Sequence, residues 1–171
     1  MKNLTIGALL LVFFAACQPP AQQARYTTDS PEITHAKATM DAYFAGDWET
    51  MRAAFVDTAK IYHNSTDYVG PDENIKNAQE GVSNVSSYEL AEDSFWEMIV
   101  EDDGDKWVYF WGEWKAVHAK TGNTMSVPFH LAWQYENGLV AEEHGFWDNS
   151  AFILEDQAAA AAAEASADEE M

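Results

Sequence analysis

The stretch TMSVPFHLAWQY, residues 124–135, alternates apolar and polar side chains in the way expected of a β-strand with one buried face. Its apolar face is continuous and consists of Met125, Val127, Phe129, Leu131, Trp133 and Tyr135. On the other face, His130 and Gln134 are expected to point outward or into a dimer contact. We therefore expect the apolar face to line an interior that is closed by helices from earlier in the chain.

Three more long β-prone runs surround this strand, and short polar turns separate them. The runs are residues 88–101, 106–119 and 139–148, and the turns contain Asp-Gly, Thr-Gly and Asn-Gly pairs. Such pairs between β-prone runs indicate hairpins, so the sequence predicts an antiparallel meander. Strands of this length must twist and curl, and Gly112 is a position where the sheet can bend.

Three helices are predicted before the meander. The first begins at Pro31, the second follows Asp47 and the third begins at Pro71, and each carries apolar residues at helical spacing. A short β-prone segment at residues 60–64 separates the second helix from the third. Helices followed by a curled antiparallel sheet predict an α+β fold in which the helices cover one face of the sheet.

The composition excludes several kinds of partner and site. Acidic residues outnumber Lys and Arg by 29 to 9, so the chain has almost no charge with which to neutralise phosphates, and nucleic acid is not expected as a partner. The chain contains seven Trp and 13% aromatic residues, a composition that argues against a disordered chain. The histidines show no ligand-like spacing with carboxylates, and no phosphate-binding or dinucleotide motif occurs, so neither a metal nor a cofactor is expected.

The start of the chain resembles a bacterial lipoprotein signal. Residues 1–16 have a short positive end and an apolar run, and Phe14-Ala15-Ala16-Cys17 resembles a lipobox, in which the cysteine is acylated. The alternative is an ordinary signal peptide with a coincidental cysteine. Acylation of Cys17 implies a lipid-anchored protein of the bacterial cell envelope, and Gln18 favours the outer membrane, facing the periplasm.

The rest of the chain divides by composition into three parts. Residues 17–29 are expected to form a flexible tether, and residues 30–154 the folded domain. Residues 155–171 are rich in alanine and end in acidic side chains, without an amphipathic face that could dock. We expect this last segment to be a frayed, solvated tail.

The closing segment VAEEHGFWD, residues 140–148, completes a pattern that resembles a known superfamily. Together with Thr121-Gly122 and Asn137-Gly138 between strands, it is similar to the nuclear transport factor 2-like superfamily, and more narrowly to its SnoaL-like branch, over residues 32–154. This resemblance implies a cone-shaped α+β domain. It leaves the activity open, because the superfamily includes isomerases, cyclases, epoxide hydrolases, dehydratases and binding domains without catalysis.

Individual members of the superfamily allow a comparison of residues. Tyr62-His63-Asn64 matches the water-holding Tyr-x-Asn of limonene epoxide hydrolase, but Gly112, Trp114 and Gly145 occupy the positions of its charged residues. Epoxide hydrolysis by that mechanism is therefore not expected. One alignment with ketosteroid isomerase places the general-base aspartate of that enzyme on His63.

Four polar residues are the candidates for catalysis. The same alignment turns Glu143 inward and Val140 and His144 outward, although the opposite parity is also compatible with the sequence. A carboxylate inside an aromatic cone can exchange a proton near neutral pH, or it can merely accept a hydrogen bond from Tyr62 or from a Trp N–H. His63 suits the same proton transfer, or lies at the surface. Tyr62 and Asn64 either hold a water or a ligand oxygen, or anchor the following loop.

The expected pocket is lined by large apolar residues, five of them aromatic. Its members are Trp48, Trp114, Phe129, Leu131, Trp133 and Trp147. A small apolar or aromatic ligand can stack among them, whereas a cone filled by these side chains leaves no cavity. Three functions follow: ligand binding, an isomerase, cyclase or dehydratase reaction, or a non-catalytic assembly role. In the last case Trp107 and Trp111, on the outer face, suggest a homodimer interface.

Overall fold

The computed structural model describes residues 25–169, and the predicted signal and Cys17 lie outside this range. A single seven-stranded sheet runs in the order β1-β4-β5-β6-β7-β2, with β3 pairing β5. Its strands are β1 (Tyr26–Thr27), β2 (Phe55–His63), β3 (Val85–Leu90), β4 (Phe95–Val100), β5 (Lys106–His118), β6 (Thr124–Glu136) and β7 (Leu139–Trp147). The helices are α2 (Pro31–Ala45), α3 (Trp48–Ala53), α4 (Pro71–Gly81) and α5 (Ser150–Glu169).

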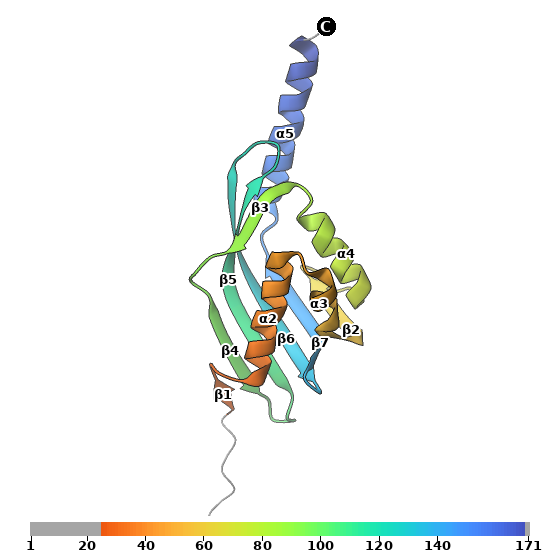
Figure 1. The fold of residues 1–171 in the computed structure, drawn as a ribbon, viewed down its shortest axis with the longest axis vertical. Helices are drawn as coiled ribbons and strands as arrows, with labels where there is room; N and C mark the ends of the chain where they lie inside the picture. The colour runs from red at the N-terminus through yellow and green to blue at the C-terminus, as the bar shows by residue number, and fades with distance from the viewer. Residues whose placement is uncertain (1–24, 170–171) are drawn as a thin grey trace, which may run out of the picture.

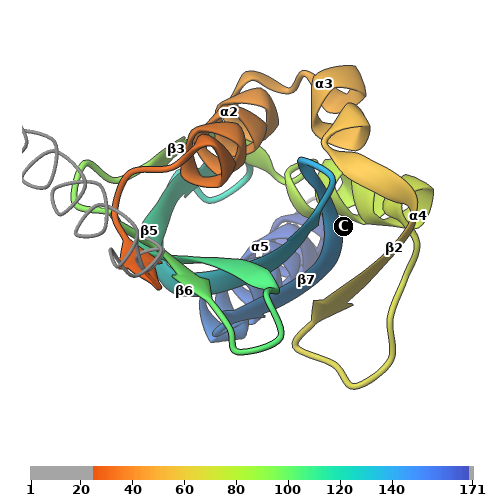
Figure 2. The same cartoon turned by 90° about the horizontal axis from the view of Figure 1, so that it is seen from below.

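Helices α2, α3 and α4 lie on one side of the curved sheet, as Figures 1 and 2 show. This arrangement confirms the predicted α+β class. Each helix begins where the sequence predicts: the Ser30 hydroxyl accepts a hydrogen bond from the Ile33 N–H, and the Asp47 carboxylate accepts one from Thr50. The Glu32 carboxylate, 2.5 Å from Lys106 Nζ, then joins α2 to β5. Burial alone would raise the pKa of Glu32, but the hydrogen bond and charge of Lys106, together with hydrogen bonds from the backbone and from Ser30, outweigh burial and lower it.

The predicted strand at residues 88–101 consists of two strands. β3 and β4 are separated by residues 91–94 and pair with different halves of the same edge of β5. Phe95 of β4 pairs with Trp111, and Leu90 of β3 pairs with Trp114, so the change of partner falls at Gly112. A polar break in an apolar run is enough to divide the strand while both pieces stay in the sheet.

The apolar face of β6 points to the interior, as predicted. Met125, Val127, Leu131, Trp133 and Tyr135 are all buried. Leu131, Trp133 and Tyr135 pack with α2 and with the inner face of β5, where Val108 and Phe110 are fully enclosed. This confirms the inference on which the expected interior depends.

Strand β7 turns Glu143 inward and His144 outward, which agrees with the alignment-based parity. The outward placement of Val140 is wrong, because Val140 is buried in the core. Tyr135 pairs with Val140 and Gln134 with Glu142, so Ala141 is one extra residue in β7. This β-bulge reverses the parity on either side of it, and the sequence pattern gives no sign of it.

Residues 150–169 form one helix, although a frayed tail is expected from residue 155 onward. The Glu155 carboxylate accepts hydrogen bonds from Thr121 and Asn123 in the β5–β6 turn, and Asp156 lies 3.3 Å from Nε2 of His118. His118 is only 3% exposed, so the start of α5 covers its side chain. Beyond residue 160 the helix is exposed and projects from the domain (Figure 1). None of the helices in the described range meets the length and hydropathy of a membrane span.

Candidate functional site

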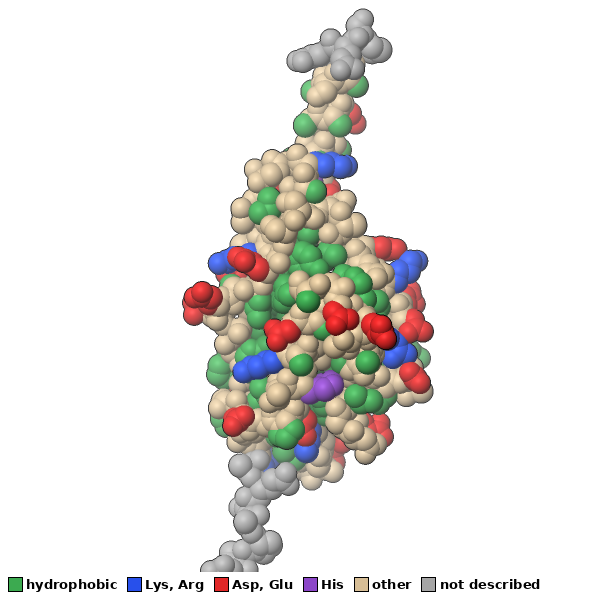
Figure 3. Space-filling view, in the orientation of Figure 1, with side chains coloured by type: hydrophobic (Ala, Val, Ile, Leu, Met, Phe, Trp, Pro, Cys, Tyr) green, Lys and Arg blue, Asp and Glu red, His purple; other side chains and the backbone are tan. Residues whose placement is uncertain are grey.

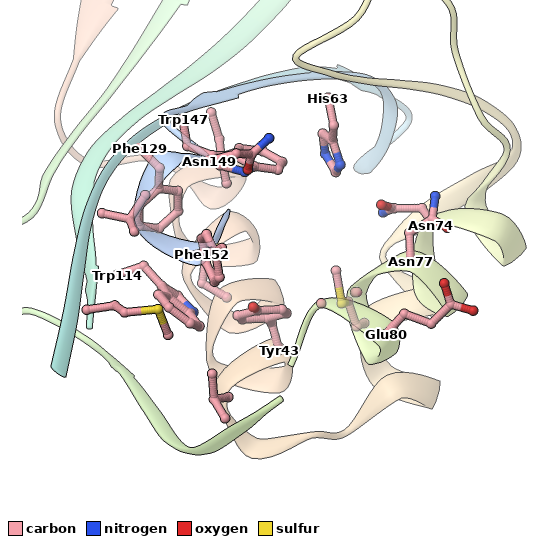
Figure 4. Close-up of a pocket in the computed structure, with 18 of the residues that line it drawn as sticks. Tyr43, His63, Asn74, Asn77, Glu80, Trp114, Phe129, Trp147, Asn149 and Phe152 are labelled. Carbon is pink, nitrogen blue, oxygen red and sulfur yellow. The ribbon is translucent and has the colours of Figure 1, made fainter. Parts of the chain in front are cut away.

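A cavity of about 520 Å³ lies between the inner face of the sheet and helices α2 and α4. Its walls are mainly apolar, and aromatic side chains from β5, β6, β7 and the start of α5 form one side of it (Figure 4). On the face that Figure 3 shows, Asp and Glu are interspersed with Lys and Arg, and hydrophobic side chains show between them. Because this cavity lies inside the domain, the interior is hollow, and the alternative of a filled cone does not apply to this structure.

A buried polar group of three residues interrupts the apolar wall. Glu143 is 4% exposed, and its two carboxylate oxygens have different partners: Oε1 lies 2.5 Å from His63 Nε2, and Oε2 accepts a 2.8 Å hydrogen bond from Trp133 Nε1. A buried carboxylate without partners would be costly, and these two contacts compensate for its loss of water. His63 and Glu143 both line the cavity.

Strand pairing brings these three side chains together. Trp133 of β6 is directly opposite Glu143 of β7, and on the other side β2 runs parallel to β7 with His63 beside Gly145. A Cβ atom on Gly145 would lie 2.7 Å from His63 Cδ2. Glycine at this position therefore makes the space that the imidazole ring occupies.

The contacts determine which imidazole nitrogen is free. A carboxylate can only accept hydrogen bonds, so when Glu143 is ionised the neutral His63 ring carries its proton on Nε2 and donates it to the carboxylate. The lone pair is then on Nδ1, the nitrogen available to accept a proton from a bound molecule. A positive charge formed on the ring would be stabilised by the adjacent carboxylate. The arrangement can therefore act as a base that is oriented by an acid residue.

The opposite end of the cavity is aromatic and contains the Tyr43 hydroxyl. Trp114 packs against Phe152 of α5, with ring centroids 5.1 Å apart. Burial raises the pKa of Tyr43 to about 12, so its hydroxyl stays neutral across the physiological range. The nearby Trp114 N–H partly opposes this rise, but the two groups do not reach hydrogen-bond geometry.

Five of the six predicted pocket residues line the cavity: Trp114, Phe129, Leu131, Trp133 and Trp147. Two of the four predicted catalytic residues, Glu143 and His63, line it as well. Trp48 does not line it. Its ring packs edge-on against Tyr43, 5.9 Å between centroids, and Tyr43 takes the place in the wall. Trp48 therefore supports the wall from behind, while Met51 of the same helix lines the cavity.

Tyr62 and Asn64 lie outside the cavity lining. Tyr62 stacks on the ring of His144 on the outer face, with centroids 4.7 Å apart. The Asn64 side chain donates to the Trp147 carbonyl at 3.0 Å and accepts from the Trp147 N–H at 3.1 Å. This agrees with the anchoring alternative for Asn64, since both ends of its amide hold the end of β7.

Asn74, a buried residue of α4 that lines the cavity, is not among the site residues predicted from the sequence. Its position four residues before Ala78, on the apolar stripe of the predicted third helix, is the signal that could have identified it. Among the described residues, no three His, Cys, Asp or Glu side chains are grouped so that they could hold a metal ion.

Solved structures with the same architecture exist, although no family profile and no curated sequence matches the chain. An NTF2-like protein of unknown function from Burkholderia pseudomallei is 19% identical with a TM-score of 0.58, over 73% of this chain and 96% of that one. A proposed SnoaL-like polyketide cyclase from Shewanella denitrificans is 15% identical with a TM-score of 0.58, over 76% and 99%. A ketosteroid isomerase-like protein from Catenulispora acidiphila, solved with trimethylamine, is 8% identical with a TM-score of 0.55, over 68% and 87%.

These likenesses establish the fold. The described domain has the cone-shaped α+β architecture of the nuclear transport factor 2-like proteins, as the sequence predicts, and a SnoaL-like protein is among its structural neighbours. At identities of 8–19%, the chemistry has to be argued from the residues of this chain.

Proposed function

We propose that the domain binds a small, largely apolar or aromatic molecule in the cavity. The observation that carries this proposal is the hollow itself, about 520 Å³ with aromatic walls and few polar groups, which is a size and lining typical of ligand sites. A protein of this fold from Catenulispora acidiphila holds a small molecule, which supports the proposal by analogy. The lipid anchor at Cys17, the envelope location and the homodimer stay predictions from the sequence.

Blocking the cavity is expected to abolish binding. Ala78 faces the cavity from α4, so Ala78→Trp places a large ring in the ligand space, whereas Gln79→Trp puts the same ring on the exposed side of that helix. Indane, a bicyclic hydrocarbon, is the probe. It should stabilise the protein and Gln79→Trp, by about 2.7 kcal/mol at a hundredfold excess over Kd, and should not stabilise Ala78→Trp. Calorimetric titration and thermal unfolding measure this, and equal binding by both variants would place the ligand elsewhere.

A second function, proton transfer beside a carbonyl group, is favoured by the geometry of His63 and Glu143. A buried carboxylate is expensive inside an apolar cavity unless it is hydrogen-bonded, and here it lies against an imidazole, the side chain that most often serves as a general base. His63 Nδ1 would remove a proton from the carbon next to a carbonyl, and the carboxylate of Glu143 would stabilise the imidazolium that forms. The reaction class is that of an isomerase, cyclase or dehydratase.

Exchange of carbon-bound hydrogen tests this second function. 1-Indanone in D₂O should lose the protons at its C2 faster with the protein than without it, as followed by proton NMR. His63→Ala or Glu143→Gln should slow the protein-dependent rate by about 10²-fold or more. The Glu142 and His144 pair, with a 2.8 Å contact on the outer face of the same strand, supplies the control: Glu142→Gln and His144→Ala should leave the rate unchanged. An unaltered rate in both cavity variants contradicts proton transfer by this pair.

A further inference from the structure

Two buried side-chain N–H groups in the described part of the chain have no hydrogen-bond acceptor: Nδ2 of Asn74 and Nε1 of Trp114. Both residues line the cavity, and they are 1% and 7% exposed. Unsatisfied buried donors are rare in folded proteins because they lose their bonds to water without replacement. Two of them in one cavity need an explanation.

The other indoles at the cavity and in the core are satisfied. Trp133 donates to Glu143 and Trp147 donates to Asn149 at 2.7 Å, while Trp96 donates to Ser94 at 3.2 Å. The missing acceptor is therefore particular to Trp114, whose neighbours in the cavity are aromatic rings. The Tyr43 hydroxyl is close to the Trp114 N–H, but the two groups do not reach hydrogen-bond geometry.

The two donors come from opposite walls. Asn74 is in the first turn of α4, and Trp114 is on the inner face of β5. Figure 4 shows open space between them, with His63 on the side of Asn74 and Tyr43 on the side of Trp114. A molecule that fills this space is within reach of a donor at each end.

The charges around the cavity restrict the acceptor. No Lys or Arg is among the residues that line it in the described structure, whereas Glu80, Glu143 and Asp156 are. His63 and His118 also line it, and with both imidazoles neutral an anionic ligand would lose its hydration without gaining a countercharge. The Tyr43 hydroxyl also stays neutral, because burial raises its pKa to about 12. The acceptor that suits these donors is an uncharged oxygen.

We propose that Asn74 and Trp114 bind neutral oxygen atoms, such as a carbonyl, of a ligand whose body is apolar, and that they select against carboxylates. This inference rests on the proposed ligand-binding function and assigns its polar recognition to residues outside the His63 and Glu143 pair. The two donors would hold and orient the molecule, and they would take no part in moving a proton.

Four probes with one ring system test the inference: indane, 1-indanone, indane-1-carboxylate and 1-aminoindane. Calorimetric titration of the protein is expected to give at least fivefold tighter binding of 1-indanone than of indane, and weaker binding of the carboxylate. Trp114→Phe and Asn74→Leu should each reduce the ratio of 1-indanone affinity to indane affinity at least threefold, whatever either change does to the binding of indane itself. Trp111→Phe, on the outer face of the same strand as Trp114, is the matched control and should change nothing.

The possible results distinguish this inference from the proposed ligand-binding function on which it rests. Equal binding of indane and 1-indanone, a preference that survives both variants, or tightest binding of the carboxylate or the amine overturns the inference while ligand binding stands. Binding of none of the four probes overturns both. Ligand-free stability provides a second readout: Asn74→Leu removes an unsatisfied donor and should leave the melting temperature unchanged or higher, whereas a structural role for the amide would lower it.

Discussion

Trp133→Phe is expected to lower the free energy of unfolding by about 3 kcal/mol. Trp133 is 2% exposed and stacks on Trp96 with ring centroids 6.0 Å apart, so a smaller ring leaves a gap in the core. The change also removes the N–H that bonds Glu143 Oε2, and the buried carboxylate then lacks one of its two partners. The two losses add, which makes this one of the most damaging conservative changes in the domain.

Urea denaturation of a double-mutant cycle separates the two losses. In a Glu143→Leu background no carboxylate is left without a partner, so Trp133→Phe should cost about 1–2 kcal/mol less than in the native background. Trp111→Phe is the control, because Trp111 is 53% exposed and its change should stay within about 0.5 kcal/mol. Equal costs in both backgrounds would mean that the indole contributes only packing.

Gly112→Ala is expected to destabilise the domain by about 3 kcal/mol, the upper end of what overpacking costs. A Cβ at this position would lie 2.2 Å from Cζ of Phe110, a fully buried ring that is enclosed by Trp96 and Phe129. The ring cannot move aside without displacing its neighbours. The clash also falls where β5 changes partner from β4 to β3, so the sheet itself must adjust.

Chemical denaturation checks this effect, with Gly81→Ala as the matched change. No atom lies within 4 Å of a Cβ at Gly81, the last residue of α4, so this variant should be unchanged or more stable by up to about 1 kcal/mol. If Gly112→Ala proves as harmless as Gly81→Ala, the Phe110 ring has space that the structure does not show.

The sequence predicts the elements whose side chains repeat with one period and are bounded by clear caps and turns. The inner face of β6 follows from strict alternation, and the inward position of Glu143 follows from alignment to strands of the same fold. Residues 91–94 and the bulge at Ala141 were missed because one irregular residue or a short polar break hardly changes an apolar pattern. Both irregularities are decided by sheet curvature, which is a property of many residues together.

The candidate site was predicted in part for a similar reason. His63 and Glu143 were identified singly, but their contact depends on the parallel pairing of β2 with β7, which joins segments 80 residues apart. Tyr62 and His63 were both candidates, although adjacent residues of a strand point to opposite faces and only one of them can enter the cavity. Asn74 carries no motif, and its role emerges only when the absence of a partner for its amide is known.

Strand β2 is an edge of the sheet and pairs with it through β7 alone. This position affects how the domain responds to heat and to denaturant. Edge segments open locally at a smaller free-energy cost than global unfolding. Fraying of β2 would carry His63 away from Glu143 while the buried strands β5 and β6 remain intact. The temperature at which the domain loses its imidazole and carboxylate contact then depends on how firmly β2 is held to β7, and the hydrogen bonds between Asn64 and Trp147 help to hold it there.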